Sequence, residues 1–243
     1  MGNKKYFSNC ECDSCNEHFS LYETSLSNYG GILNTFSRIK GKKGYAKHKG
    51  VNEQSETFVE NNQVRIIINE PSSNENLAFE FDEKTNLITI NTNKYSYTPI
   101  HALKSLVKIG FCMLDQTSLQ PYDYTRKWLI EQSELKLPSN NPLYYLYRRI
   151  GGRLFPHPWA VLYKKRKEFS SAPCPTHSLL VFYGLFGYQI FLPGNILDNW
   201  IHDRNRIVLP IVNQISITKN NNNQKIITSV EKTNLSSHEV KIS

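Results

Sequence analysis

The residues best suited to chemistry lie within the first 50 positions of the chain. Cys12 and Cys15 are separated by two residues, a spacing that lets the chain turn back so that both thiolates can bind one metal ion. Structural zinc takes four ligands, so this pair would supply half of a site. Further candidate ligands are Cys10, Cys112, Cys174, His18 and His48. On spacing alone, a metal site and ordinary buried thiols are equally good interpretations.

A basic stretch follows the cysteine pair. No acidic residue occurs between Glu23 and Glu53. Within this interval, the cations that could contact phosphates are Arg38, Lys40, Lys42, Lys43 and Lys47. Contacts of this kind give affinity for a nucleic-acid backbone without reading its sequence. A metal-binding turn that leads into a cationic segment therefore predicts a region that binds a polyanion.

This arrangement resembles the second half of an HNH endonuclease motif, in the zinc-knuckle variety found in bacterial and phage proteins. The resemblance rests on residues 2–9, on Cys12-x-x-Cys15-Asn16 and on Phe19-x-x-x-Glu23, followed by the glycine-lysine stretch 41–44. A second likeness covers residues 97–108 and Trp128-Leu129. Together the two likenesses fall within the first 130 residues, and the rest of the chain matches only loosely.

The resemblance implies a partial ββα-metal (HNH) module with named site residues. Asn9 would brace the hairpin of that module and orient the catalytic base, while Asn16 would lie near a catalytic magnesium or manganese ion. Cys12 and Cys15 would belong to a structural zinc site. The histidine that activates water and the first CxxC of the motif precede the matched part, so the resemblance places both ahead of Met1.

Three hypotheses for the function follow. The first is an HNH-type endonuclease, N-terminally truncated, that hydrolyses phosphodiester bonds in DNA with a divalent metal. The second is a catalytically inactive nucleic-acid-binding protein derived from such a nuclease. The third is an interaction protein whose basic loops serve solubility. Salt dependence separates the third hypothesis from the others, because phosphate binding weakens steeply as ionic strength rises.

Composition favours the same partner. The 243-residue chain carries a formal net charge of +8, which suits nucleic acid or an anionic surface. Its five cysteines, without a recognisable signal peptide, indicate a reducing compartment, and we expect a cytoplasmic protein. The apolar runs are too short to span a membrane. Nucleic acid, in the first place DNA, is the expected partner, and no membrane association is expected.

The patterning predicts an α+β fold in which the partial module precedes a domain of antiparallel sheet plus helices. The expected divisions are residues 1–50 for the module with its basic loop, 51–217 for the α+β domain and 218–243 for a mobile low-complexity tail. Apolar periodicity predicts helices over 19–34, from Pro99 to about Leu114, and over 122–134. Alternating or β-branched runs predict strands at 64–68, 77–81, 87–90, 159–163, 178–183, 188–192 and 206–212. Gly184 and Gly187 are expected to bracket a hairpin turn.

Three smaller features carry expectations of their own. Lys104 and Lys108 are four residues apart and are expected on a solvated helix face. The basic run 164–167 follows Trp159 and Tyr163, which suits stacking of single-stranded nucleic acid; an exposed strand edge protected by lysines explains it equally well. Cys174 near His177 lacks a third residue to orient a base, so a thiol nucleophile is a remote alternative.

Overall fold

A computed structural model of the protein describes residues 13–38, 40–41, 44–49, 55–68, 79–90, 95–130, 147–170, 174–198, 206–210, 216–218, 227–229 and 237–241. Helices and antiparallel sheets make up this part of the chain, as the sequence predicts. The helices are α1 (Asp13–Gly30), α2 (Leu33–Phe36), α3 (Pro99–Phe111), α4 (Gln116–Leu119) and α5 (Asp123–Ile130), with single 3-10 turns at Gln120–Tyr122 and Lys167–Phe169.

The strands form several small antiparallel sheets. In chain order they are β1 (Lys40–Gly41), β2 (Gly44–Tyr45), β3 (His48–Lys49), β4 (Ser55–Glu60), β5 (Gln63–Ile68), β6 (Phe79–Asp82), β7 (Leu87–Ile90), β8 (Tyr147–Lys164), β9 (His177–Phe191), β10 (Arg206–Pro210), β11 (Ser216–Thr218), β12 (Ile227–Ser229) and β13 (Ser237–Lys241). The pairings are β1–β2, β3–β4–β5, β6–β7, β8–β9, β10–β13 and β11–β12.

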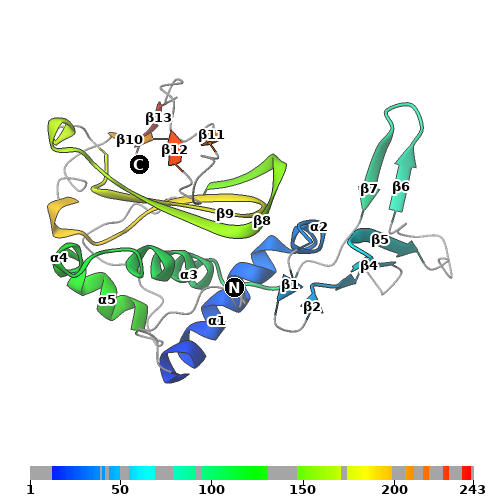
Figure 1. The fold of residues 1–243 in the computed structure, drawn as a ribbon, viewed down its shortest axis with the longest axis horizontal. Coiled ribbons are helices and arrows are strands. Elements are labelled where there is room, and N and C mark those ends of the chain that lie inside the picture. The colour runs from blue at the N-terminus through cyan, green and yellow to red at the C-terminus, as the bar shows by residue number, and fades with distance from the viewer. Residues whose placement is uncertain are drawn as a thin grey trace.

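Figure 1 shows two bodies of unequal size. In the larger one, the ribbon of β8 and β9 lies between a layer of helices and the short strands β10 to β13. The smaller one, which we call the small lobe, contains β1 to β7 and lies beyond α2. The chain enters the small lobe through α1 and α2 and returns from it into α3. The basic stretch is therefore held apart from the main core.

Helix α1 confirms most of the helix predicted over residues 19–34. It begins six residues earlier than that prediction, at Asp13, and ends at Gly30. Gly31 has a positive φ of 55°, and its backbone N–H donates to Ser27 O and Asn28 O at 3.2 and 3.1 Å. This left-handed residue closes the helix. The remaining turn of the predicted helix forms separately as α2.

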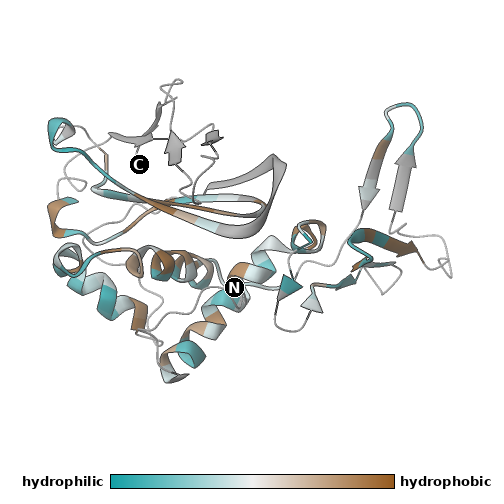
Figure 2. Ribbon diagram, viewed as in Figure 1, coloured by the Kyte–Doolittle hydropathy of each residue, from teal (hydrophilic) through white to brown (hydrophobic). Residues whose placement is uncertain are grey.

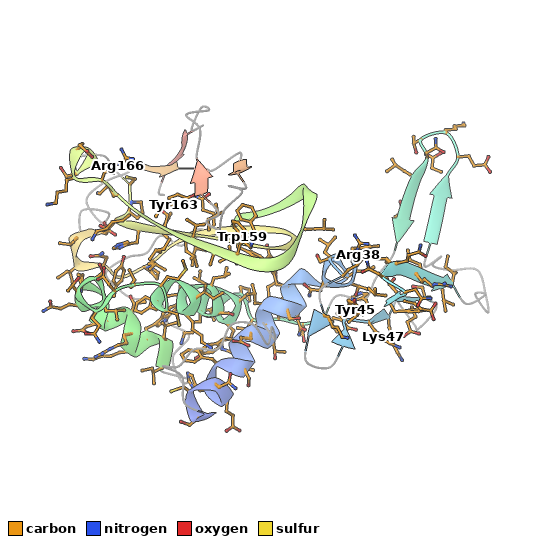
Figure 3. The ribbon with its side chains drawn as sticks, in the orientation of Figure 1. Arg38, Tyr45, Lys47, Trp159, Tyr163 and Arg166 are labelled. Carbon is orange, nitrogen blue, oxygen red and sulfur yellow. The ribbon has the colours of Figure 1, made fainter. Side chains whose placement is uncertain are left out.

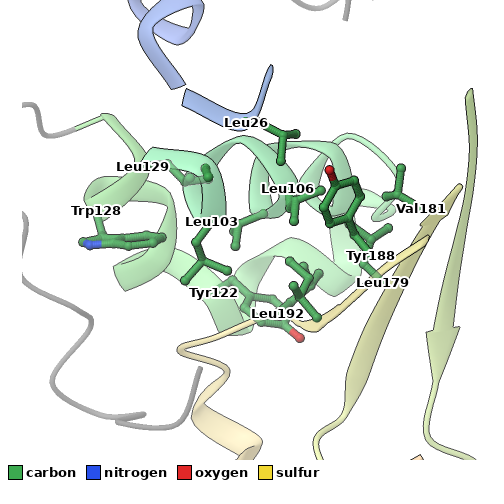
Figure 4. Packing of buried hydrophobic residues seen from close by; sticks show 13 residues of the cluster. Leu26, Leu103, Leu106, Tyr122, Trp128, Leu129, Leu179, Val181, Tyr188 and Leu192 are labelled. Carbon is green, nitrogen blue, oxygen red and sulfur yellow. The ribbon is translucent and has the colours of Figure 1, made fainter. Parts of the chain in front are cut away.

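Helix α3 is the centre of the core. Pro99 occupies its first turn, where a missing N–H has no helical partner to lose. The helix buries a cluster of apolar residues against α1, α5 and β9 (Figure 4), and Figure 2 shows the same hydrophobic concentration along α3 and the middle of the β8–β9 ribbon. The cluster comprises Leu26, Ala102, Leu103, Leu106, Val107, Tyr122, Trp128, Leu129, Leu179, Val181, Tyr188, Ile190 and Leu192.

One predicted turn is wrong. Strand β9 runs without interruption from His177 to Phe191, so the strands expected at 178–183 and 188–192 are a single strand. Gly184 has a φ of 60° and pairs with Phe155, where the register of β8 against β9 shifts. A glycine at such a bulge lets the strand change direction without ending. Gly184 therefore marks an irregularity in the pairing of β8 with β9, and this irregularity is a bulge instead of the predicted hairpin turn.

The small lobe contains antiparallel strands, as predicted, and adds β4, which the sequence patterns did not single out and which pairs with β5. Asn61 and Asn62 join β4 to β5 and have positive φ angles of 48° and 60°. These angles define the two-residue turn that matches the twist of a hairpin, and asparagine tolerates them better than most residues.

Two strands, β12 and β13, lie within the stretch expected as a low-complexity tail, and the asparagine run 219–224 lies outside the described residues. Within the described segments, no helix has both the length and the apolar character that crossing a membrane requires.

Candidate nucleic-acid interface

The start of α1 carries two of the predicted site residues. Cys15 and Asn16 lie in its first turn and are exposed to solvent. Asn9 and Cys12, the other two residues of the predicted motif, lie outside the described residues, as does Cys10. Helix α1 thus begins within the CxxC pair, one residue after Cys12. The N-terminal turn of a helix favours a thiolate and any other negative charge placed there.

The other candidate metal ligands are distributed over different elements. Cys112 is exposed at the C-terminal end of α3, and Cys174 is half-buried shortly before β9. His48 is buried in the small lobe, with its ring 5.1 Å from the ring of Tyr95. No group of three His, Cys, Asp or Glu side chains converges among the described residues. Of the expected zinc ligands Cys12 and Cys15, the structure therefore describes Cys15, whose side chain is exposed. Its predicted partner, Cys12, lies outside the described residues.

His18 belongs to a contact between helices. Its Nε2 lies 3.2 Å from Leu129 O and 3.4 Å from the Tyr22 hydroxyl. A carbonyl oxygen only accepts, so His18 is the donor in the contact with Leu129 O, which joins the end of α5 to α1.

The residues that carry the two HNH-like stretches touch one another. Lys108 of α3 places Nζ 3.3 Å from Glu23 Oε1 and 4.6 Å from the ring centre of Phe19. Phe19 and Glu23 are four residues apart and so lie on one face of α1. The two stretches that resemble HNH proteins therefore form one packed unit, in which Phe19 and Glu23 hold helices together.

The expectation that Lys104 and Lys108 face solvent is wrong. Lys104 is 1% exposed, and its Nζ donates to Trp128 O at 2.6 Å. The same ammonium lies 5.2 Å from the ring centre of Tyr22 and 4.8 Å from that of Trp128. Helix α1 packs across this face of α3, which hydrophobic periodicity within α3 alone cannot reveal.

Three of the predicted phosphate-binding residues, Arg38, Lys40 and Lys47, are described in or beside the small lobe, and Figure 3 labels Arg38 and Lys47. Arg38 has a φ of 52°, is exposed, and donates from Nη1 to Asn62 O at 3.0 Å, next to the β4–β5 turn. Lys40 is exposed on β1 directly opposite Tyr45 on β2. Lys42 and Lys43 connect these two strands and lie outside the described residues. Lys47 follows β2 and has a side chain 69% exposed.

Lys47 makes two weak contacts on the sheet surface. Its Nζ lies 3.5 Å from Glu56 Oε1 and 5.6 Å from the ring centre of Phe58. An exposed ion pair of this kind contributes little stability. Lys47 can therefore exchange the carboxylate of Glu56 for a phosphate at small cost.

The two faces of the β3–β4–β5 sheet differ in character. His48, Ser55 and Thr57 share the face that is buried, and α2 is fastened to this side of the lobe by a hydrogen bond from Thr35 Oγ1 to Ala46 O at 3.1 Å. The opposite face bears the charged residues. On it lie Lys49, Glu56, Phe58, Glu60, Arg65 and Ile67, by the alternation of each strand and the registers of the two pairings.

The second basic region, at the end of β8, has both of its aromatic side chains on one face of the β8–β9 ribbon. Ala160 and Leu162 pack against the helical core, so Trp159 and Tyr163 lie on the other face of the ribbon, which Figure 1 shows turned toward β10 to β13. Both rings are half-buried, and burial raises the pKa of the Tyr163 hydroxyl. The exposed basic residues here are Lys164, Arg166 and Lys167, at the hydrophilic end of the ribbon in Figure 2.

A buried polar network beside this region argues against thiol chemistry. His177 Nδ1 lies 2.8 Å from the Tyr122 hydroxyl, and the carboxylate of Asp198 accepts from the backbone N–H and hydroxyl of Thr176 at 2.7 to 3.0 Å. Burial raises the pKa of the Cys174 thiol. A protonated thiol is a poor nucleophile, and His177 is bonded to Tyr122.

No protein-family model matches the chain, and neither curated proteins nor solved structures gave a match. Membership of the HNH endonucleases therefore stays a prediction that rests on the residues named above.

Proposed function

We propose that this chain is an HNH-type endonuclease chain that binds DNA through its small lobe. The observation that carries the proposal is the start of α1 at Asp13, which exposes Cys15 and Asn16 in the first helical turn. The resemblance implies a helix that continues from the knuckle and carries a residue near the metal. The basic lobe that follows α1 and α2 supplies the exposed cations a DNA backbone would need.

The proposal gives the residues distinct roles. Cys12 and Cys15 would hold a structural zinc ion, and Asn16 would lie beside a catalytic magnesium or manganese ion. A divalent ion bound there would polarise the scissile phosphate. Asn9 would brace the hairpin of the module. The exposed side chains of Arg38, Lys40 and Lys47, together with Lys42 and Lys43, would contact the phosphates on either side.

Metal content and plasmid nicking test this proposal together. The purified chain is expected to contain one zinc per protein and to nick supercoiled plasmid when magnesium or manganese is added. The Cys15→Ser variant should lose the zinc. The Asn16→Ala variant should keep the zinc but lose the nicking activity. Glu17→Ala, an exposed neighbour in the same turn, is the control that should change neither.

A chain without stoichiometric zinc and without nicking would overturn the endonuclease proposal. A measurement of DNA binding at several salt concentrations would then distinguish the remaining hypotheses. DNA affinity that falls steeply with salt would identify the alternative, a nucleic-acid-binding protein that no longer cuts, whereas affinity insensitive to salt would contradict both.

A further inference from the structure

The exposed face of the β3–β4–β5 sheet carries an aromatic ring at its middle strand. Phe58 lies on β4, directly opposite Arg65 on β5. Lys47 Nζ lies 5.6 Å from the centre of the ring. Arg65 is exposed on one side of Phe58 and Lys47 on the other. We call this surface, made of Lys47, Lys49, Glu56, Phe58, Glu60, Arg65 and Ile67, the Phe58 face.

The Phe58 face is open to solvent. The side chains of Lys47 and Arg65 are 69% and 52% exposed, and Ile67 is 48% exposed. Phe58 itself is partly covered, with the Lys47 ammonium above its ring. A flexible lysine is the easiest cover to displace, because its position rests on one long exposed ion pair and one cation–π contact.

The two carboxylates on this face form ion pairs with Lys47 and Arg65. Glu56 is paired with Lys47 at 3.5 Å, and Glu60 with Arg65 at 2.8 Å. Arg38, which is exposed and donates to Asn62 O beside the β4–β5 turn, adds positive charge at the border of the sheet. The surface is thus positive overall, and each exposed ion pair can be replaced by a phosphate contact.

We propose that the Phe58 face binds single-stranded nucleic acid, with one base stacked on the Phe58 ring and the flanking phosphates on Lys47, Lys49 and Arg65. The inference rests on the proposed function and specifies its substrate. An unpaired base offers a π face to an aromatic side chain, and stacking combined with a cationic track is how single strands are bound without sequence preference. In a duplex the faces of the bases are already stacked on one another. A duplex can therefore contact the cations with its phosphates but cannot stack a base on the Phe58 ring.

Substitution of Phe58 separates the ring from the charge. Phe58→Leu keeps an apolar side chain and removes the aromatic face, whereas Phe58→Trp keeps that face and adds a fluorescent reporter. Val59→Leu, on the same strand but the opposite face, is the matched control. Thermal unfolding of each variant shows whether the sheet is intact.

Fluorescence anisotropy with a labelled oligothymidylate and with a duplex of equal length then gives the answer. Phe58→Leu should weaken single-strand binding about tenfold and leave duplex binding within twofold, and oligothymidylate should quench the fluorescence of Phe58→Trp. Equal single-strand affinity for Phe58→Leu and wild type, or unquenched tryptophan in a bound complex, would overturn the inference and leave DNA binding intact. Failure of the wild-type chain to bind either nucleic acid would instead overturn the proposed function.

Discussion

At the scale of single residues, Lys104 of α3 contacts both α1 and α5. Its ammonium is buried between Tyr22 of α1 and Trp128 of α5, and it donates to the Trp128 carbonyl at the end of α5. Cations near a helix C-terminus satisfy carbonyls that have no partner within the helix. The two ring faces add cation–π attraction. Lys104 therefore acts as a buried cap that joins α3 to α5.

Removal of this charge should destabilise the protein. Lys104→Met keeps most of the buried aliphatic chain but removes the hydrogen bond from Nζ to the Trp128 carbonyl. We expect the free energy of unfolding to fall by about 2 kcal/mol, since hydrogen bonds to charged groups contribute in this range. Urea denaturation measures the change, and Lys127→Met, at an exposed position of α5, is the control. Equal stability of Lys104→Met and wild type would contradict this role.

These residue-scale features show where sequence reasoning reaches its limit. Apolar periodicity located α3 and its first residue, because that information is local. It assigned Lys104 and Lys108 to solvent, because nothing within α3 indicates that α1 packs over them. In the same way, Phe19 and Glu23 stood out as parts of a motif, while their contact with Lys108 depends on a partner more than 80 positions away.

At the scale of elements, the close approach of α3 to the end of β9 depends on Gly110. A Cβ atom at this position would collide with the side chain of Leu192, which is fully buried in the core. Glycine lowers helix propensity, so its place near the end of α3 is explained by this contact.

Gly110→Ala should therefore be destabilising in spite of alanine's better helix propensity. We expect a loss of about 1–3 kcal/mol, the usual cost of overpacking a core. In Gly30→Ala, the new Cβ would meet the flexible end of the Asn34 side chain, which can move, so a smaller loss is expected. Urea unfolding of both variants and of Gly110→Ala/Leu192→Ala tests the contact. If the collision is the cause, the double variant should lose less than the sum of its single variants.

Strand β9 shows why the sequence alone could not distinguish a hairpin turn from a bulge. Gly184 and Gly187 signalled an irregularity, but a turn and a bulge use the same residue type. Only the pairing with β8 distinguishes them, since 11 residues of β9 pair with a strand that begins 30 positions earlier. Local sequence does not contain that information.

At the scale of the whole molecule, the two exposed basic regions lie at opposite ends. Figure 3 shows Arg38 and Lys47 in the small lobe and Arg166 at the far end of the β8–β9 ribbon. The sequence identified both regions by composition alone. It could not rank them, because the ranking depends on what each aromatic side chain faces in the folded protein. Trp159 and Tyr163 lie on the ribbon face toward β10 to β13, whereas Phe58 shares its face with exposed cations.

This arrangement predicts that one end of the molecule carries the nucleic-acid affinity. The triple variant Arg38→Ala/Lys40→Ala/Lys47→Ala removes exposed charge from the small lobe, and Lys164→Ala/Arg166→Ala/Lys167→Ala removes equal charge from the end of β8. Net charge is matched between the two variants, so any difference between them reflects position. Each lost phosphate contact lowers the slope of log affinity against log salt by about 0.7 for a single strand and 0.9 for a duplex.

We expect the small-lobe variant to show a shallower slope and weaker binding, while the β8 variant binds like wild type. Titrations of labelled oligonucleotide at several salt concentrations measure both slopes. A reduced slope in both variants would mean that the nucleic acid contacts both ends of the molecule. A reduced slope in the β8 variant alone would place the interface on the ribbon and contradict the assignment to the small lobe, because the charge removed is the same and only its location differs.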